Sequence, residues 1–195
     1  MQGQVVNNVK APFHMGHNPL FPKMHAPSVS ESCVVLLFIV GVTFGGGFAT
    51  SALTMAEDGD DWYEGLEKPD WTPPNSVFGP VWAALYLLMS FAAFLVWRRG
   101  GFMKQALPLS LYTIQLVANF SWVFIYLEAR DLLAAFIELC CLWVLIIITA
   151  VLFGRVRKSA AFLLAPYIAW VAFAGSLNLE LWLLNKDNEE SKKSS

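Results

Sequence analysis

The sequence predicts an all-α membrane protein, a five-transmembrane-helix bundle with a proline- and tryptophan-rich lid loop between the first and second helices. Two observations carry this prediction. The 195-residue chain is 56% hydrophobic and only 14% charged, whereas soluble domains are about 25% charged. Its apolar residues also form five runs of about 20 residues, the length that crosses a bilayer as a helix. Since a backbone in lipid must satisfy its own hydrogen bonds, such runs give a helical bundle.

We expect these runs to form one transmembrane domain over residues 31–185. Residues 1–30 are polar and rich in proline, which predicts a disordered extension. Residues 186–195 form a charged tail. Only residues 128–131 separate the third and fourth runs, and so short a connection predicts an antiparallel helix pair. The five spans are predicted at 33–56, 78–97, 107–127, 132–153 and 160–184.

An odd number of spans places the termini on opposite sides of the membrane. The basic residues that follow the second and fourth spans then share the N-terminal side: Arg98, Arg99, Lys104, Arg155, Arg157 and Lys158. The positive-inside tendency would put that side in the cytoplasm. That tendency applies to a protein that enters the membrane through a translocon. We expect a multi-pass integral membrane protein.

Composition also narrows the classes of partner. The formal net charge is −2 and no run of Lys and Arg forms a basic footprint, so no nucleic-acid partner is expected. The three cysteines match no zinc or disulfide spacing. Histidines of the N-terminal extension could hold a metal loosely, but a disordered tail is the simpler interpretation. No metal site is predicted, and the lipid bilayer is the expected surrounding.

The stretch 62–86, WYEGLEKPDWTPPNSVFGPVWAALY, predicts the lid. Its four prolines cannot lie in one continuous helix. We expect an ordered loop, with helix beginning near Phe78–Pro80 and Pro80 in the first turn. Three tryptophans and two tyrosines supply large rigid area with a polar handle. The stretch is expected to fold over the mouth of the bundle and close a pocket for a flat, apolar ligand.

Small residues mark one face of the first span. Gly41, Gly45 and Ala49 recur at four-residue spacing, with Gly46 and Gly47 beside them. Such spacing favours close approach of another helix. The alternative is that the glycine backbone lies against a ligand.

Polar residues within the spans suggest a binding site, because burying them in hydrocarbon is costly. Asn119 and Trp122 share a face of the third span, and Trp170, Ala174 and Asn178 form a stripe on the fifth. Each asparagine could simply bond a neighbouring helix, worth about 0.6 kcal/mol. The functional alternative is that the two stripes face each other and hold a ligand's polar atoms.

The sequence does not decide the charge state or the partners of two acidic residues within the spans. Glu138 and Glu180 could be neutral, near an interface, or paired with a basic group. Among the eight tryptophans, Trp62, Trp82 and Trp122 join Trp170 as pocket candidates, because they occur beside polar or small residues and near the proline-rich stretch.

Four blocks of residues resemble the translocator protein family, also called the tryptophan-rich sensory protein or peripheral-type benzodiazepine receptor family. The resemblance covers about residues 33–185. Its most specific blocks are WYEGLEKPDWTPPNSVFGPVW at 62–82, RRGGF at 98–102, PLSLYTIQLVANFSW at 108–122 and PYIAWVAFAGSLN at 166–178. Blocks in the same order across four of five spans are far more specific than one short motif.

The resemblance implies a homodimer of five-helix bundles, each with a pocket closed by the loop after the first helix. It implies a receptor or carrier for tetrapyrroles such as protoporphyrin IX or haem, and for sterols or benzodiazepine-type ligands. These are ligands, and no cofactor is required. For a eukaryotic source the resemblance implies the outer mitochondrial membrane, with other membranes still open. Indoles stacking on a flat tetrapyrrole agree with this. Carried over by motif position, the ligand-binding residues are Trp62, Tyr63, Pro73, Phe78, Trp82, Tyr86, Asn119, Trp122, Trp170 and Ala174.

The resemblance also implies an alternative, a light-dependent porphyrin-degrading enzyme that uses Trp62 and Trp170. The sequence contains no base–nucleophile pair and no nucleotide-binding loop, so catalysis stays open and a non-catalytic receptor is preferred. The family's animal sterol motif places a tyrosine ahead of a basic residue. Here the corresponding stretch, 177–186, has Trp182 and an internal Glu180, and such motifs are weak even when intact.

Overall fold

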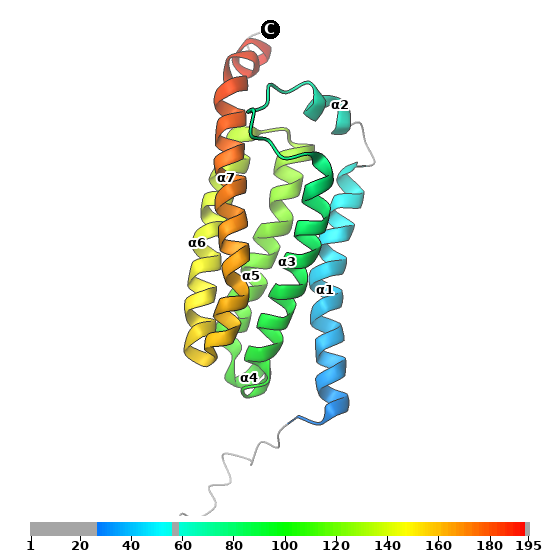
Figure 1. Cartoon of the computed structure of the whole chain (residues 1–195), viewed down its shortest axis with the longest axis vertical. Coiled ribbons are helices and arrows are strands. Elements are labelled where there is room, and N and C mark those ends of the chain that lie inside the picture. The colour runs from blue at the N-terminus through cyan, green and yellow to red at the C-terminus, as the bar shows by residue number, and fades with distance from the viewer. Residues whose placement is uncertain (1–26, 56–58, 194–195) are drawn as a thin grey trace, which may run out of the picture.

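The computed structural model describes residues 27–55 and 59–193, and five long helices dominate these ranges (Figure 1). Two short helices, α2 (Gly59–Glu64) and α4 (Gly101–Lys104), lie in the connections. The predicted N-terminal extension lies outside the described residues up to position 26. The long helices are α1 (Val29–Met55), α3 (Asn75–Trp97), α5 (Ala106–Val123) with its π-helical continuation η1 (Phe124–Glu128), α6 (Leu132–Val156) and α7 (Lys158–Lys193).

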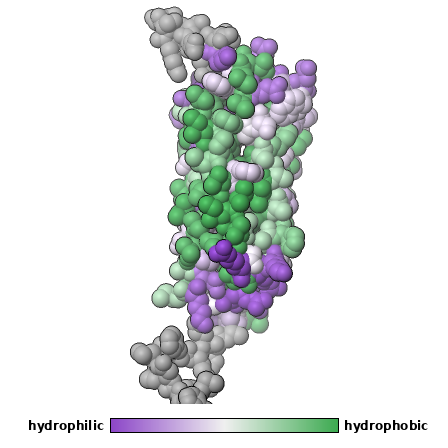
Figure 2. Space-filling model, turned by 90° about the vertical axis from the view of Figure 1, so that its left-hand side faces the viewer, coloured by the Kyte–Doolittle hydropathy of each residue, from purple (hydrophilic) through white to green (hydrophobic). Residues whose placement is uncertain are grey.

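All five predicted spans are long and apolar enough to cross a membrane. Figure 2 shows an apolar belt on one side of the molecule, with hydrophilic residues gathered toward both ends. This distribution matches a bilayer core bounded by polar headgroups. The fold class predicted from the sequence is therefore confirmed: the described chain is an all-α bundle of five candidate membrane spans.

Four of the long helices form a ring, and the fifth packs on its outside. Helices α3, α7, α6 and α5 contact one another in that order, while α1 packs against α3 and α5 (Figure 1). The segment after α1, which holds α2, crosses the end of the bundle where α7 emerges. Helix α4 turns the chain at the opposite end. The lid is thus at the end of the bundle opposite the cluster of basic connections.

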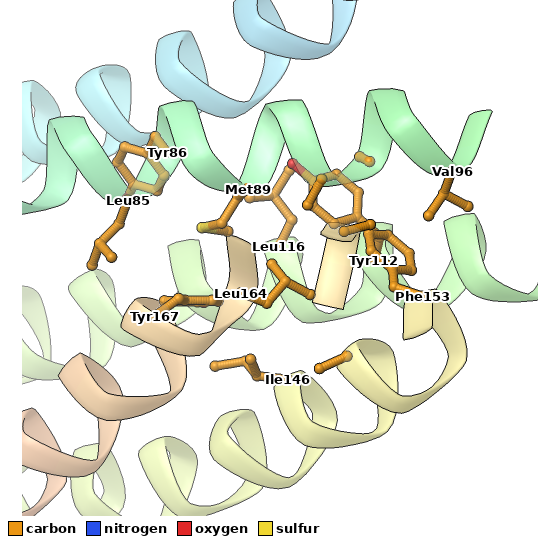
Figure 3. Close-up of a cluster of buried hydrophobic side chains, with 14 of the residues drawn as sticks. Leu85, Tyr86, Met89, Val96, Tyr112, Leu116, Ile146, Phe153, Leu164 and Tyr167 are labelled. Atoms are coloured by element: carbon orange, nitrogen blue, oxygen red, sulfur yellow. The ribbon is translucent and has the colours of Figure 1, made fainter. Parts of the chain in front are cut away.

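The half of the bundle away from the lid is filled by an apolar core. Figure 3 shows side chains from α3, α5, α6 and α7 converging there. Met89, Val96 and Phe153 are completely buried. A hydrogen bond joins α1 to this core, between the hydroxyls of Thr43 and Tyr112 at 2.7 Å. Close packing of this kind leaves no space for a ligand.

Several helix boundaries differ from the sequence prediction. Helix α1 begins at Val29 rather than near residue 33, and α6 ends at Val156 rather than near residue 153. Helix α3 begins at Asn75, directly after Pro74, so Pro80 lies inside the helix rather than in its first turn. Pro74 has φ −55°, and its fixed φ suits the position before a helix. At the C-terminus, α7 continues to Lys193 instead of ending near residue 184.

The predicted small-residue face of α1 is only partly correct. A Cβ atom added to Gly41 or Gly45 would meet nothing within 4 Å. Added to Gly46 it would lie 2.5 Å from the ring of Phe120, and added to Gly47 it would overlap the ring of Tyr86. The close approach therefore uses the neighbouring glycines, because the face that meets α3 and α5 is rotated from the four-residue stripe.

Candidate ligand-binding site

A cavity of about 460 Å³ lies at the lid end of the bundle. Ligand-binding pockets commonly span about 300–1,000 Å³. Its wall comes from α1, the segment containing α2, α3, α5 with η1, and α7. The described lining residues are Phe44, Gly47, Phe48, Tyr63, Asn75, Phe78, Gly79, Trp82, Ala83, Tyr86, Asn119, Trp122, Val123, Tyr126, Leu127, Ala174, Leu177, Asn178 and Leu181.

Two pairs of aromatic rings form much of this wall. Trp82 and Tyr86, one turn apart on α3, have ring centroids 5.5 Å apart. Trp122 and Tyr126 stack across the junction of α5 and η1, with centroids 5.0 Å apart and planes 23° from parallel. The π-helical turn is closed by a bond from the Ala129 N–H to the Phe124 carbonyl. Such turns are frequent at functional sites, and this one places Tyr126 in the wall.

A hydrogen bond between helices fixes one part of the wall. The hydroxyl of Tyr86 on α3 donates to Oδ1 of Asn119 on α5 at 3.1 Å. Both side chains are buried. Asn119 thus has the helix-bridging role that the sequence left open, and it also lines the cavity.

Asn178 differs from Asn119. It is 2% exposed, and neither its amide nitrogen nor its amide oxygen has a hydrogen-bond partner among the described residues. The indole Nε1 of Trp122 is likewise buried without a partner. Both residues line the cavity. Buried polar groups are normally paired, so this wall offers hydrogen-bonding capacity that the protein does not use.

The lid is attached to the C-terminal part of α7 by its backbone. The Asn185 amide accepts from the Glu67 N–H at 3.0 Å and donates to the Glu67 carbonyl at 2.9 Å. Asn185 also donates to the Leu181 carbonyl one turn earlier, at 2.8 Å. A further bond runs from the Trp71 indole N–H to Glu180, at 2.9 Å. Glu180 is therefore paired, whereas both carboxylate oxygens of Glu138 are buried without a partner.

Two aromatic residues of α2, at the lid end of the bundle, make cation–π contacts with basic side chains. Nζ of Lys68 lies 4.2 Å from the centroid of the Tyr63 ring. The guanidinium of Arg130 lies 5.9 Å from the Trp62 ring, and that ring meets Tyr126 edge-on at 5.8 Å. Burial, and to a smaller extent Glu64, raises the pKa of Tyr63, so its phenol stays protonated at neutral pH.

Seven of the ten residues proposed from sequence line the cavity: Tyr63, Phe78, Trp82, Tyr86, Asn119, Trp122 and Ala174. Trp62, Pro73 and Trp170 are outside the lining. Trp62 packs behind Tyr126, and Trp170 meets the cavity residue Phe78 at 5.8 Å. Pro73 lies in the segment between α2 and α3, where it is half-buried.

The position of Trp170 follows from helix geometry. With 3.6 residues per turn, each four-residue step rotates a side chain by about 40°, so Trp170 and Asn178 differ by about 80°. Ala174 and Asn178 reach the cavity, while Trp170 borders a groove between α3 and α7 lined also by Val81 and Leu85. The predicted stripe therefore faces the cavity at Ala174 and Asn178 but not at Trp170.

Sequence reasoning missed two aromatic residues of α1 and several aliphatic positions. Phe44 and Phe48 line the cavity, but the first span is apolar all round and its pattern does not single them out. Gly47 also lines the cavity, and it is one of the glycines for which the sequence left open a place beside a ligand. Tyr126 was recoverable, because it lies one turn after Trp122. Gly79 and Ala83 were recoverable in the same way from their position beside Phe78 and Trp82.

Comparison with known proteins agrees with this architecture. Residues 33–183 match the TspO/MBR family. The chain is similar to the translocator protein of Ovis aries, 38% identical over 150 residues, which cover 76% of this chain and 88% of that one. It is 43% identical to the translocator protein of Homo sapiens over 127 residues, 64% of this chain and 75% of the other. A tryptophan-rich protein TspO of Archaeoglobus fulgidus is 34% identical over 150 residues, 77% and 94% of the two chains.

Proposed function

The chain belongs to the TspO/MBR family of membrane proteins, and we propose from this premise that it is a receptor or carrier for a tetrapyrrole such as protoporphyrin IX or haem. The ligand would lie in the cavity beneath the lid. Sterols and benzodiazepine-type compounds are further candidate ligands for the same space. The observation that carries the proposal is a cavity of about 460 Å³ walled by two aromatic pairs.

The shape and chemistry of the wall support a flat ligand. Trp82 with Tyr86 and Trp122 with Tyr126 present rigid rings on two different helices. Aromatic rings gain energy from offset or edge contacts with other conjugated rings, beyond the area that they bury. The hydrogen bond between Tyr86 and Asn119 holds one ring in place before any ligand arrives, which lowers the cost of ordering the site on binding.

A cavity-filling substitution tests the proposal. Gly79 lines the cavity, and a Cβ atom there would meet nothing within 4 Å. We expect Gly79→Leu to weaken protoporphyrin IX binding at least about tenfold, because the new side chain occupies ligand space. Binding is measured from the porphyrin absorbance in titrations of protein in lipid nanodiscs.

Gly41→Leu is the matched control. It places the same side chain on another membrane helix, where a Cβ again meets nothing and no cavity is lined. Its affinity should equal that of the parent protein. If both variants weakened porphyrin binding equally, or if neither weakened it, the cavity would not be the binding site.

The alternative function is light-dependent oxidative degradation of the bound porphyrin by dioxygen. The observation favouring it is that Trp62 and Trp170 each pack edge-on against a lining ring, Tyr126 and Phe78 respectively. Illumination of the same complex distinguishes the two functions. A receptor should lose porphyrin absorbance no faster than free porphyrin, whereas an enzyme should accelerate the loss and lose that acceleration in Gly79→Leu.

A further inference from the structure

We propose that the end of the bundle opposite the lid is a binding surface for anionic phospholipids, whose phosphates lie against basic residues of two helix connections. One connection is residues 98–105, between α3 and α5, and the other is residues 155–158, where α6 gives way to α7. The basic end, as we call this surface, is defined by six residues: Arg98, Arg99, Lys104, Arg155, Arg157 and Lys158. None of them lines the cavity, so the inference does not depend on what the cavity binds.

The first argument is where these residues lie relative to the candidate membrane spans. Arg98 directly follows the span that ends at Trp97, and Arg157 separates the span that ends at Val156 from the next one. Both connections lie at the same end of the bundle (Figure 1). Residues directly beyond a span of this length lie in the headgroup region of a bilayer. The cations of the basic end are therefore at the level of the lipid phosphates.

The second argument is that the protein does not neutralise this charge. Among the described residues, none of the six forms an ion pair. The described acidic residue at this end is Glu31, near the start of α1 (Figure 1), and its carboxylate accepts from the Ser28 N–H at 2.7 Å. Clusters of about 4–8 Lys and Arg residues beside a span are typical of sites for anionic lipids, with each cation contributing about fivefold in affinity.

The third argument is that the first connection is a fixed turn. Gly100 and Gly101 have φ +143° and +71°, values that residues with a Cβ rarely adopt. A Cβ added to Gly100 would lie 2.8 Å from Cδ of Lys104, so the aliphatic part of that lysine packs against the turn. The side-chain amide of Gln105 donates to the Arg99 carbonyl at 3.2 Å across the same turn. The turn therefore holds Arg99 and Lys104 near each other before a lipid binds.

The fourth argument separates a lipid from a soluble anion. Apolar side chains are exposed beside the cations: Met103 of α4 is 91% exposed, Phe102 is 50% exposed, and Phe162 near the start of α7 is 75% exposed. A free phosphate would pair with the cations but leave these side chains in water. A phospholipid supplies a phosphate for the cations and acyl chains for the apolar groups, the combination that interfacial segments use.

The test counts the lipids that stay bound to the full-length protein. Protein in a neutral detergent is equilibrated with equal amounts of dioleoylphosphatidylglycerol and dioleoylphosphatidylcholine, which share acyl chains and differ in headgroup charge. Native mass spectrometry then counts each bound lipid. We expect the anionic lipid to be enriched at least about fivefold over the neutral one. Equal retention of the two lipids would overturn the proposal.

A triple variant locates the binding. Arg99→Gln, Lys104→Gln and Arg155→Gln together remove three cations whose side chains are exposed, and the enrichment should fall below about twofold. The matched control removes three cations from the lid end, through Lys68→Gln, Arg130→Gln and Lys186→Gln, and should keep the parental enrichment. Equal loss in both triple variants, or loss in neither, would show that the basic end is not the binding surface.

Two further measurements address a structural role and a soluble ligand. Arg99→Lys with Arg155→Lys keeps the charge and should keep the enrichment, whereas its loss would mean that the arginines act through the shape of the turn. An excess of glycerol 3-phosphate should leave the anionic lipid bound, because it has no acyl chains. Displacement would assign the basic end to a soluble anion and overturn the proposal. The comparison of the two lipids uses the parent protein and so does not depend on how any variant folds.

Discussion

The two halves of the bundle are built from the same helices but are packed in different ways. Toward α4, Met89, Val96 and Phe153 are completely buried, and the side chains in Figure 3 meet from four helices. Toward the lid, the same α3 carries Phe78 and Trp82, and a cavity of about 460 Å³ remains between the helices. One half is therefore a core, and the other is a wall around a space.

The difference lies in what fills the space between the helices. In the packed half, aliphatic groups such as Met89 and Ile146 fill the space beside the stacked rings of Tyr112 and Phe153, so that the interior reaches the density of a solid. The large planar rings of the lid half are rigid, and they pack against one another in stacked and edge-on pairs. The lid then closes the end of this space through Asn185 rather than by filling it. The proposed ligand site therefore lies where the packing is incomplete.

The largest expected effect comes from truncating the packed half. Leu164→Ala removes a side chain that is 1% exposed and should lower the free energy of unfolding by about 2–3 kcal/mol, near the lower end for soluble cores because lipid is as apolar as the core. Leu127→Ala, at the cavity wall, should cost about 1 kcal/mol or less, since it enlarges an existing space. Thermal unfolding in detergent measures both. Equal losses would contradict the distinction between core and wall.

A smaller effect is expected where α1 joins the ring. Gly47→Ala forces a Cβ into the ring of Tyr86, which is held by its bond to Asn119, and should cost about 1–2 kcal/mol of stability. Gly45→Ala should be neutral or stabilising by up to about 1 kcal/mol, because its Cβ meets nothing within 4 Å and alanine favours helix. The same unfolding measurement applies. A neutral Gly47→Ala would mean that α1 is free to shift away from the cavity.

The smallest effect on stability concerns the lid. Asn185→Ala removes both bonds to the Glu67 backbone and should cost about 1 kcal/mol, while speeding ligand release about fivefold. Stopped-flow displacement of bound porphyrin measures the rate. Leu184→Ala, the exposed neighbour on the same helix, should leave the rate unchanged. If Asn185→Ala releases ligand at the parental rate, this attachment does not control access.

Much of the fold could be predicted from the sequence, because length and hydropathy act locally along the chain. The spans and their order were confirmed. Boundaries were less certain: Pro74 rather than Pro80 marks the start of α3, and α7 continues past its apolar run. A helix can extend beyond the bilayer into water, so the end of an apolar run does not mark the end of the helix.

The candidate site was predicted less completely. Motif position pointed to seven lining residues, but Trp62 and Trp170 lie one ring behind the wall. Asn178 was placed on a helix stripe that could hold a ligand's polar atoms, but it was not among the residues carried over by motif position, although it lines the cavity. A sequence shows which residues share a helix face, but not which neighbour that face meets.

By itself, the sequence determined that this chain forms five membrane-spanning helices with an aromatic, proline-stiffened segment after the first. Those properties depend on composition, on the length of the apolar runs and on the missing N–H of proline. Only the tertiary structure decided that Gly47 rather than Gly45 meets a neighbour, that Asn119 is paired while Asn178 is not, and that Asn185 holds the lid. The physical reason is that helix rotation and mutual packing are settled by all the helices together, so no single segment encodes which of its faces borders the cavity.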